Sequence, residues 1–362
     1  MSLDTRKLDH IKICLEGKVS PFSNFLDHYQ LPFQTLPEIN YADIDTSVTF
    51  FWKKLSFPFI IGSMTGGPEK GKAINEHLAR AAEQAKVALG LWSMRSVLEH
   101  PETLPTFNVR HLCPSIPLFA NIGLVQLNYG VGADEINRLI DSVQADGIFF
   151  HCNALQEVVQ PEGDTNFANL LSKLKHILPQ LHAPAIIKEV GNGMDAQTAQ
   201  HLKDIGVQRI DVSGLWGTSR PAVEGYRRDD NLADSIKTLG IPTDQSLSQC
   251  KKLSWLDLIA GGGIRSGIDI AKAIMLGASL WTSASPFLEP ALQSDEAVYQ
   301  KLLLRGKEFQ IALFSTGSKD MTSFQANFPR HCEEAFLDEA IHPHRHCEPF
   351  SEAIHKHQRS NP

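Results

Sequence analysis

The chain has 362 residues, 42% of them hydrophobic, and a formal net charge of −7 at pH 7. This length fits two domains or one α/β barrel of ~250 residues with additions. The hydrophobic content suffices for a large core and argues against disorder. The negative charge argues against nucleic acid as a partner, because nucleic-acid-binding domains usually carry a basic surface.

Cysteine usage and hydropathy indicate a soluble cytoplasmic protein that does not enter a membrane. No Cys-x-x-Cys pair occurs, so a reducing compartment is favoured over a disulfide framework. The charged N-terminus lacks the apolar segment of a signal peptide. No uncharged run reaches the ~18 apolar residues of a membrane span. The six cysteines are Cys14, Cys113, Cys152, Cys250, Cys332 and Cys347.

Residues 1–57 are predicted to form an N-terminal arm that contributes to the substrate site. They end in the proline-punctuated stretch LPFQTLPEINYADIDTS, which suggests extended chain able to fold over a barrel mouth. Arg6, Lys7 and His10 form a small cationic cluster that such an arm could bring to a diphosphate. The alternative is a charged N-terminus that is simply solvated.

Residues 58–325 carry eight short apolar runs with helical patterns between them, such as NEHLARAAEQAKV and DEINRLIDSVQA. Dense apolar strands alternating with helices indicate a parallel sheet covered on its outer face. Eight such units favour a TIM (β/α)8 barrel over an open doubly wound sheet. The runs are 58–64, 87–93, 117–123, 147–153, 184–191, 208–214, 256–262 and 279–284.

Polar residues end almost every one of these runs. In a TIM barrel the site is built from the carboxyl ends of the strands and the loops that follow. Helix capping is the alternative for any single serine, but Lys188 follows the apolar residues Ala185 to Ile187 and needs a charged partner there. The strand-end residues include Ser63, Thr65, Ser93, Arg95, Asn121, Asn153, Lys188, Glu189, Ser213 and Gly261 to Gly263.

The stretch HCNALQEVVQPEGD presents two amides and a carboxylate directly after the fourth strand. Glu157 offers a hard oxygen ligand, and Mg²⁺ in proteins usually takes one or two carboxylates together with substrate phosphates. Asn153 and Gln156 can orient a substrate through hydrogen bonds without adding charge. The alternative is an ordinary helix start, where a glutamate meets the positive end of the helix.

Two glycine-rich segments indicate a nucleotide site. GSMTGGPEKG follows the first strand, and its glycines let backbone N–H groups approach an anion or a planar ring. IAGGGIRSGIDIAKAIMLGA ends the seventh strand and starts a helix, where TIM barrels commonly bind phosphate. Arg265 adds charge, and Ser283 to Pro286 could complete the cradle. With Lys188 beside the ring, the pattern is typical of a flavin mononucleotide (FMN) site.

Residues 326–362 form a tail that contains histidine and cysteine and is predicted to be poorly ordered. RHCEEAFLDEAIH and RHCEPFSEAIH make a loose internal repeat within it. Their spacing matches no structural zinc pattern. The tail is therefore predicted to be an appendage with little functional role.

From Arg6 to about Phe324 the sequence resembles the type 2, flavin-dependent isopentenyl-diphosphate delta-isomerases. The motifs that carry the resemblance are RKLDHI, LPEINYADIDTS, MTGG, SMR, NIG, HCNALQEVVQPEGD, KEVGNGM, DVSGLWGTS, GIPTDQSL, GGIRSGIDIAKAIMLGA and FSTG. The resemblance implies a TIM barrel that binds FMN and Mg²⁺, takes NADPH or NADH as reductant and assembles as an octamer or tetramer. The implied reaction interconverts isopentenyl and dimethylallyl diphosphates by a 1,3-allylic proton shift.

The same motifs imply roles for individual residues. Arg6, Lys7 and Arg95 match contacts to the diphosphate substrate, Gln156 a substrate-binding residue involved in the proton shift, and Glu157 the magnesium ligand. We expect His10 and Asn153 to bind substrate as well, and Lys188 to act in catalysis by stabilising reduced flavin. The positions that match FMN contacts are Ser63, Met64, Thr65, Ser93, Asn121, Lys188, Ser213, Thr218, Gly262, Gly263, Ile264, Arg265, Ala284 and Ser285.

The sequence departs from the family pattern at Trp92 and Met94, where glycine and glutamine are usual, and at Cys152 and Ala154. The stretch SLWTSAS replaces an expected glycine and arginine. Two rival functions follow. An FMN-dependent 2-hydroxy-acid oxidase or dehydrogenase would need a histidine base near the late strand ends, and His151 is the strand-end histidine. A non-catalytic flavin-binding barrel would act by partner binding through the tail.

Overall fold

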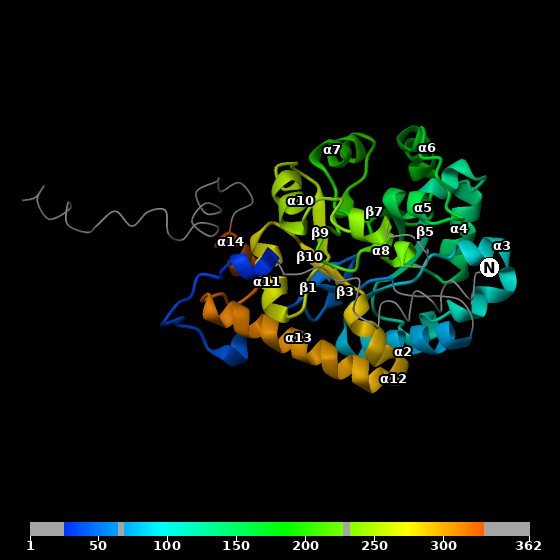
Figure 1. The fold of residues 1–362 in the computed structure, drawn as a ribbon. Coiled ribbons are helices and arrows are strands. Elements are labelled where there is room, and N and C mark those ends of the chain that lie inside the picture. Colours follow the sequence, from blue (N-terminus) through cyan, green and yellow to red (C-terminus); the bar gives the residue numbers. More distant parts are fainter. Residues whose placement is uncertain (1–24, 64–68, 227–231, 329–362) are drawn as a thin grey trace, which may run out of the picture.

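The computed structural model describes residues 25–63, 69–226 and 232–328. Eight parallel strands close into a barrel in the order β10-β3-β4-β5-β6-β7-β8-β9, which confirms the TIM barrel and each predicted strand (Figure 1). The barrel strands are β3 (Phe59–Ile61), β4 (Ala88–Gly90), β5 (Leu118–Gly123), β6 (Gly147–Cys152), β7 (Ala185–Glu189), β8 (Arg209–Asp211), β9 (Asp257–Gly261) and β10 (Leu280–Ser283).

The barrel interior is filled by alternate residues of each strand, because successive side chains point to opposite faces. One set packs together inside the lower half of the barrel, while residues between them, such as Ile148 and Ile187, join the core beneath the helices. Burial on both sides explains why the strands read as continuous apolar runs. The inner set is Ile60, Ala88, Phe119, Phe149, Ile186, Ile259 and Leu280.

A β-hairpin that the sequence did not predict closes the amino-terminal end of the barrel. Strands β1 (Val48–Phe50) and β2 (Lys53–Leu55) pair antiparallel, and Phe50, Phe51 and Leu55 join the inner cluster. Lys53 Nζ lies 2.7 Å from Asp146 Oδ1 at the same end. This part of the predicted N-terminal arm therefore lies opposite the barrel mouth and does not fold over it.

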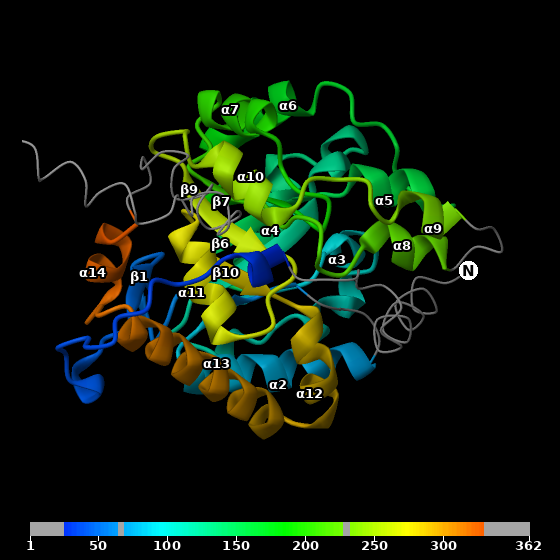
Figure 2. The same cartoon turned by 60° about the vertical axis from the view of Figure 1, so that its left-hand side comes forward.

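Residues 25–29 of the arm lie beside helices at the other end of the barrel. Lys272 Nζ donates to the carbonyl of Leu26 at 2.8 Å, and Tyr29 Oη donates to Asp244 Oδ2 at 3.1 Å. Figure 2 shows this dark blue segment near α11 (Gly267–Met275). Arg6, Lys7 and His10 lie outside the described residues, so their expected place at the diphosphate stays a prediction.

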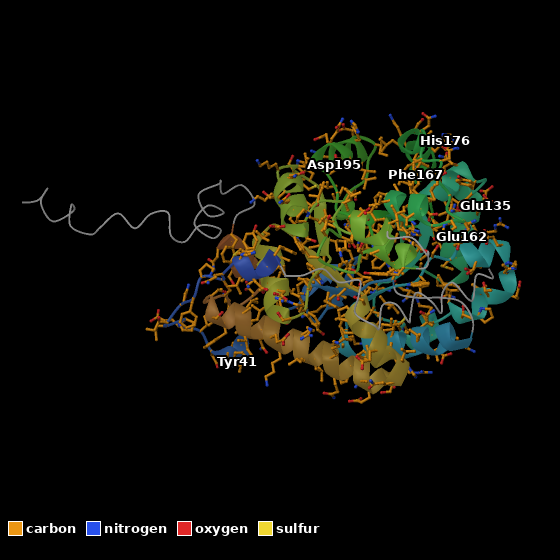
Figure 3. The ribbon with its side chains drawn as sticks, in the orientation of Figure 1. Tyr41, Glu135, Glu162, Phe167, His176 and Asp195 are labelled. Atoms are coloured by element: carbon orange, nitrogen blue, oxygen red, sulfur yellow. The ribbon has the colours of Figure 1, made fainter. Side chains whose placement is uncertain are left out.

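The helices form the outer layer, with α13 running along one flank over α2 and beside α12 (Figures 1 and 2). Figure 3 shows Tyr41 on the flank of α13, where its ring meets Phe314 edge-on with centroids 5.6 Å apart. Among the described residues, none of the helices has the length and hydropathy needed to span a membrane. The predicted tail beyond 328 lies outside the described part of the chain.

The chain outside the strands contains two kinds of helix. The α-helices are α2 (Glu69–Ala85), α3 (Arg95–Glu99), α4 (Ala133–Ser142), α5 (Ala154–Val159), α6 (Leu170–Ile177), α7 (Ala196–Asp204), α8 (Arg220–Gly225), α9 (Leu232–Ile236), α10 (Thr243–Cys250), α11 (Gly267–Met275), α12 (Leu288–Gln293), α13 (Asp295–Ser315) and α14 (Met321–Ala326). The 3-10 turns are η1 (Phe25–His28), η2 (Tyr41–Asp43), η3 (Pro101–Thr106), η4 (Arg110–Leu112), η5 (Leu124–Asn128), η6 (Leu178–Gln180) and η7 (Ser285–Phe287).

Candidate active site

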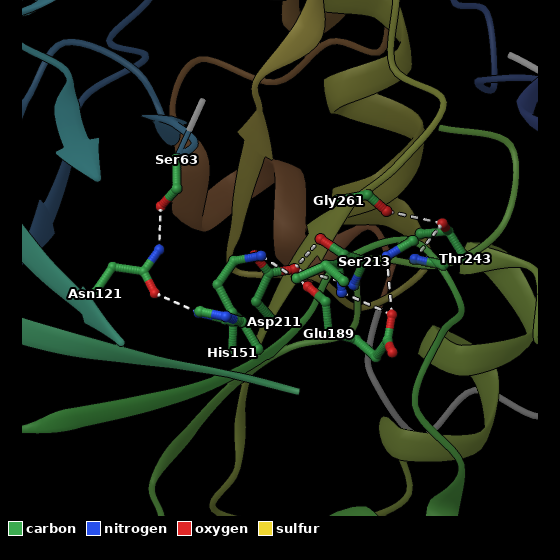
Figure 4. Close-up of polar contacts among 12 residues, drawn as sticks. Ser63, Asn121, His151, Glu189, Asp211, Ser213, Thr243 and Gly261 are labelled. Carbon is green, nitrogen blue, oxygen red and sulfur yellow. Dashed lines mark hydrogen bonds and ion pairs between the residues drawn. The ribbon is translucent and has the colours of Figure 1, made fainter. Parts of the chain in front are cut away.

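A polar layer lies above the apolar interior, at the carboxyl ends of the strands. It continues the inward-facing alternation one step beyond the apolar set, so each side chain points into the barrel from a different strand. Figure 4 shows several of its members joined by hydrogen bonds. The layer contains Asn121, His151, Lys188, Asp211 and Thr282, with Gly62, Gly90 and Gly261 on the remaining strands.

Ser63, Asn121 and His151 form one hydrogen-bonded chain across this layer. Asn121 Nδ2 donates to Ser63 Oγ at 2.7 Å and to the carbonyl of Leu91 at 3.1 Å. Asn121 Oδ1 therefore faces His151 Nδ1, 2.8 Å away, and must accept a proton from it. Burial, helped by the nearby charges of Lys188 and Arg220, lowers the pKa of His151 to about 3. The imidazole is thus a neutral donor at neutral pH.

Lys188 finds its charged partner on the next strand. Lys188 and Asp211 are register neighbours on β7 and β8, and Lys188 Nζ lies 3.8 Å from Asp211 Oδ2. Nζ also donates to the carbonyl of Glu189 at 2.7 Å. Asp211 Oδ1 accepts from Ser213 Oγ at 2.6 Å and from Ser213 N at 3.0 Å. The partner that a lysine in a barrel strand requires is therefore a fully buried aspartate.

The glycines at the end of β9 let neighbouring loops approach closely. A Cβ at Gly261 would collide with Ser213 Oγ, and one at Gly262 would collide with the carbonyl oxygen of Gly214. Gly262 also has φ +88°, a conformation that side-chain-bearing residues rarely adopt. Thr243 Oγ1 donates to the carbonyl of Gly261 at 2.8 Å. The turn is thus a tightly fixed platform of bare backbone beside Lys188 and Asp211.

This platform fits a flavin. A planar ring needs a floor without protruding side chains, and the three glycines of the layer add none, because neighbouring side chains already occupy the space that a Cβ would take. The layer also holds a buried hydroxyl with no hydrogen-bond partner in the described residues, Thr282 Oγ1. An unpaired buried hydroxyl is costly unless a ligand or water completes it. The polar edge of an isoalloxazine supplies such a partner.

The loops after β9 and β10 hold the residues expected at the phosphate. Ile264 is buried, Ser266 caps α11, and Ala284 and Ser285 lead into η7. The Arg265 side chain is 56% exposed and pairs with Asp27, with its Nε 3.6 Å from Asp269 Oδ2. Its guanidinium is therefore already neutralised in this structure, which the sequence did not anticipate.

A second polar cluster lies at the end of β6. Asn153 Nδ2 donates to Glu157 Oε1 at 2.6 Å, and the backbone N of Asp164 donates to Glu157 Oε2 at 2.8 Å. Gln156 Nε2 donates to Oε1 of Glu224, at 3.0 Å. Asn153 acts here by holding Glu157 in place.

Arg95 is tied to the same cluster. Its guanidinium pairs with Asp164, and its Nε lies 2.6 Å from Glu99 Oε1. Gln126 Nε2 also donates to Asp164 Oδ2, at 2.8 Å. No group of three or more histidine, cysteine, aspartate or glutamate residues in the described chain is placed to hold a metal by itself. Glu157 fits Mg²⁺ only in the form in which substrate phosphates supply further ligands.

The remaining predicted contacts are placed as follows. Ser93 follows β4, and Thr218 lies in the loop after β8, where its carbonyl oxygen lies 2.9 Å from the position that a Cβ would take on Gly191. Met64 and Thr65 lie outside the described residues. Cys152, an unusual residue for its motif, is a free thiol whose pKa burial raises to about 12. It is therefore not a nucleophile at neutral pH.

The loop after β7 is held by Glu189. Its Oε2 accepts from the backbone N–H groups of Val190, Gly191 and Asn192, at 2.7, 2.8 and 2.6 Å. Burial raises the pKa of Glu189 to about 7, and these three donors oppose the rise. The strand-end polar residue that the sequence marked here thus fixes the loop next to Lys188.

Sequence reasoning missed several members of the site. Asp211 and Thr282 are polar residues inside apolar runs, and that contrast was the available signal, as it was for Lys188. Glu224 lies in the short helix α8 and Asp164 ends the motif HCNALQEVVQPEGD, and neither was assigned a role. Arg220, whose charge reaches His151, was not singled out.

Comparisons with known proteins show which family the chain resembles. The family model described as FMN-dependent dehydrogenase matches residues 151–330. Isopentenyl-diphosphate delta-isomerase of Rickettsia bellii is 46% identical over 326 residues, 88% of this chain and 95% of that protein. The Nostoc sp. protein of the same name is 43% identical over 324 residues, covering 88% and 93%.

Solved structures agree on the fold. A mandelate oxidase variant with benzaldehyde superposes with a TM-score of 0.59 at 18% identity, over 90% of this chain and 97% of that chain. Mandelate oxidase itself gives a TM-score of 0.56 at 18% identity, over 88% of each chain. At this identity the likeness establishes the barrel alone.

Proposed function

The chain belongs to the isopentenyl-diphosphate delta-isomerase family, and we propose that it interconverts isopentenyl and dimethylallyl diphosphates with reduced FMN and Mg²⁺. The observation that carries the proposal is the pairing of two features at one barrel mouth. One is the glycine platform beside Lys188, and the other is the Glu157 cluster at the end of β6. The first suits a flavin and the second a metal-bound diphosphate.

The reaction moves a double bond by one carbon without net redox change. A proton must be added at one carbon and removed at another, and positive charge develops at the tertiary carbon between them. Bound reduced FMN would supply an electron-rich ring and an exchangeable proton beside the alkene. The protein must hold that ring, hold the diphosphate and keep water away from the charge.

Residues of the polar layer are placed to hold the flavin ring. Lys188 offers positive charge to the ring in a buried setting, where electrostatic attraction is strong. Asn121 and Ser63 offer fixed hydrogen-bonding groups whose orientation the neutral His151 sets. None of these groups needs to move during reaction, which is the condition for electrostatic preorganisation.

The Glu157 cluster meets the second demand. Asn153 and the backbone N of Asp164 fix the two carboxylate oxygens, so a cation bound there would be well positioned. Gln156 is held by Glu224 and points an amide at the site. An amide is a poor acid and base, so we assign Gln156 to positioning or relaying a proton.

The 2-hydroxy-acid oxidase alternative is disfavoured by His151. That reaction needs a histidine base, and a pKa of about 3 makes His151 too weak a base to take a proton from carbon at neutral pH. Its Nδ1 proton is also engaged by Asn121. No observation in the described residues favours the non-catalytic barrel.

The test is an anaerobic assay with purified protein. The protein is loaded with FMN, reduced with NADPH or NADH, and given Mg²⁺ and isopentenyl diphosphate. We expect dimethylallyl diphosphate, formed only when the flavin is reduced and Mg²⁺ is present. Flavin binding without this product would refute the proposed reaction. We also propose that the protein is cytoplasmic. Measuring the mass of the purified protein tests the proposed assembly as an octamer or tetramer, and comparing NADPH with NADH tests the choice of reductant.

A further inference from the structure

We propose that Asp211 is a positioning residue that sets the redox preference of the flavin by offsetting the charge of Lys188. The inference rests on the FMN binding proposed above and adds a residue to that site. Asp211 is fully buried and lies on the strand next to Lys188. Neither the motifs nor the comparisons assign it a role.

The hydrogen bonds around Asp211 identify it as an anion. Oδ1 accepts two protons from Ser213, so it carries none of its own. Oδ2 accepts no hydrogen bond within the described residues, and the Lys188 ammonium 3.8 Å away supplies the positive charge that favours an ionised carboxylate there. Burial raises the pKa of Asp211, but the ammonium and the two Ser213 donors oppose that rise. The carboxylate thus forms a buried ion pair with Lys188.

The pair has a direct consequence for a flavin above it. A lone buried lysine would attract the negative charge of reduced flavin strongly, because the site is shielded from water. The negative charge of Asp211, 3.8 Å from the ammonium, offsets part of that attraction. The isoalloxazine ring of oxidised FMN is neutral, so its binding depends much less on these two charges. Asp211 therefore lowers the preference for reduced over oxidised FMN, and Lys188 raises it.

The experiment measures the ratio of the dissociation constants for oxidised and reduced FMN in four proteins, namely wild type, Asp211→Asn, Lys188→Met and the double variant. We expect Asp211→Asn to raise the ratio about tenfold, which equals about +30 mV for a two-electron couple. Lys188→Met should lower the ratio, and the double variant should return close to wild type.

Controls separate this role from a structural one. Asp146→Asn removes a carboxylate from the Lys53–Asp146 pair at the opposite end of the barrel, and should leave the ratio unchanged. A structural defect would weaken the binding of oxidised and reduced FMN equally and leave the ratio unchanged. If Asp211→Asn does not fold, the double variant still should exceed Lys188→Met by about tenfold, because it lacks the unbalanced carboxylate. A ratio that stays level or falls on removing Asp211 overturns the inference, whereas loss of all FMN binding in the wild type overturns the proposed function.

Discussion

His151 Nδ1 and Asn121 Oδ1 lie 2.8 Å apart, and this contact fixes both the tautomer of the histidine and the direction of the amide. Because Asn121 Nδ2 is committed to Ser63, its oxygen must accept, so His151 must donate. A second proton on the ring would enter a buried site beside Lys188, which explains the pKa of about 3. The relationship makes stability depend on pH.

We expect His151 to destabilise the fold as the solution becomes acidic. Between its unfolded pKa of ~6.5 and its folded pKa of about 3, the unfolded chain binds more protons, so stability rises with pH across that window. The slope contributed by one such group is at most ~1.4 kcal/mol per pH unit. His151→Asn keeps a donor near the Nδ1 position and cannot titrate, so its stability curve should be flatter than that of wild type from about pH 6.5 downward.

Chemical denaturation at a series of pH values measures this difference. The matched control is His176→Gln on α6, an exposed histidine whose loss should leave the wild-type slope in place. His151→Leu removes the donor as well and should weaken FMN binding by freeing Asn121. Equal slopes in wild type and His151→Asn would contradict the assignment.

A second prediction concerns the platform at the end of β9. Gly262→Ala would force an alanine into φ +88° and drive its methyl against the carbonyl of Gly214. We expect FMN affinity to fall at least tenfold, with a lower melting temperature. Gly206→Ala is the control, because Gly206 has φ +98° but nothing within 4 Å of the new methyl. It should share the backbone strain of ~1 kcal/mol and keep normal FMN affinity. Equal FMN losses in the two variants would show that the close approach to Gly214 is irrelevant.

The pattern of apolar runs predicted the barrel because burial on both faces leaves a direct mark on a parallel strand. Lys188 could be singled out for the same reason, since a charge stands out in such a run. Its partner Asp211 was not identified, because register between strands decides which residues meet and a single sequence does not contain that register. The β1–β2 hairpin was missed because its strands are only partly buried and form no continuous apolar run of the kind that marked equally short barrel strands such as β3 and β4.

A third prediction addresses the metal. Glu157→Gln keeps the size of the side chain and the one bond that its remaining oxygen can accept, from Asn153 or from Asp164, but it replaces the other oxygen with an NH2 group and removes the charge that Mg²⁺ requires. We expect kcat/KM to fall about 100-fold or more, which is ~2.7 kcal/mol of transition-state stabilisation, and the Mg²⁺ concentration for half activity to rise. FMN binding should not change. Glu102 has an exposed side chain, so the control Glu102→Gln should not change kcat/KM, the Mg²⁺ concentration for half activity or FMN binding. If Glu157→Gln kept full activity in the presence of a chelator, the assignment of Glu157 as the magnesium ligand would be wrong.

The final prediction concerns Arg220, the first residue of α8. Its charge acts on His151, so the guanidinium lies near the barrel mouth, and within the described part of the chain no ion pair neutralises it. A half-buried free arginine at the mouth suits a diphosphate, which arginine binds through paired hydrogen bonds. Arg220→Gln should therefore raise the KM for isopentenyl diphosphate about tenfold, ~1.4 kcal/mol, with kcat changed much less.

Steady-state kinetics at two salt concentrations tests this role for Arg220, because salt screens a charged contact and should raise the wild-type KM more than that of the variant. Arg138→Gln on α4 is the control, since Arg138 is exposed, paired with Glu135 and far from the mouth, and its KM should match wild type. FMN affinity should be the same in all three proteins. An Arg220→Gln protein with unchanged KM but weakened FMN binding would instead place the guanidinium at the flavin phosphate, because a cation that serves the cofactor changes cofactor affinity and leaves substrate affinity alone.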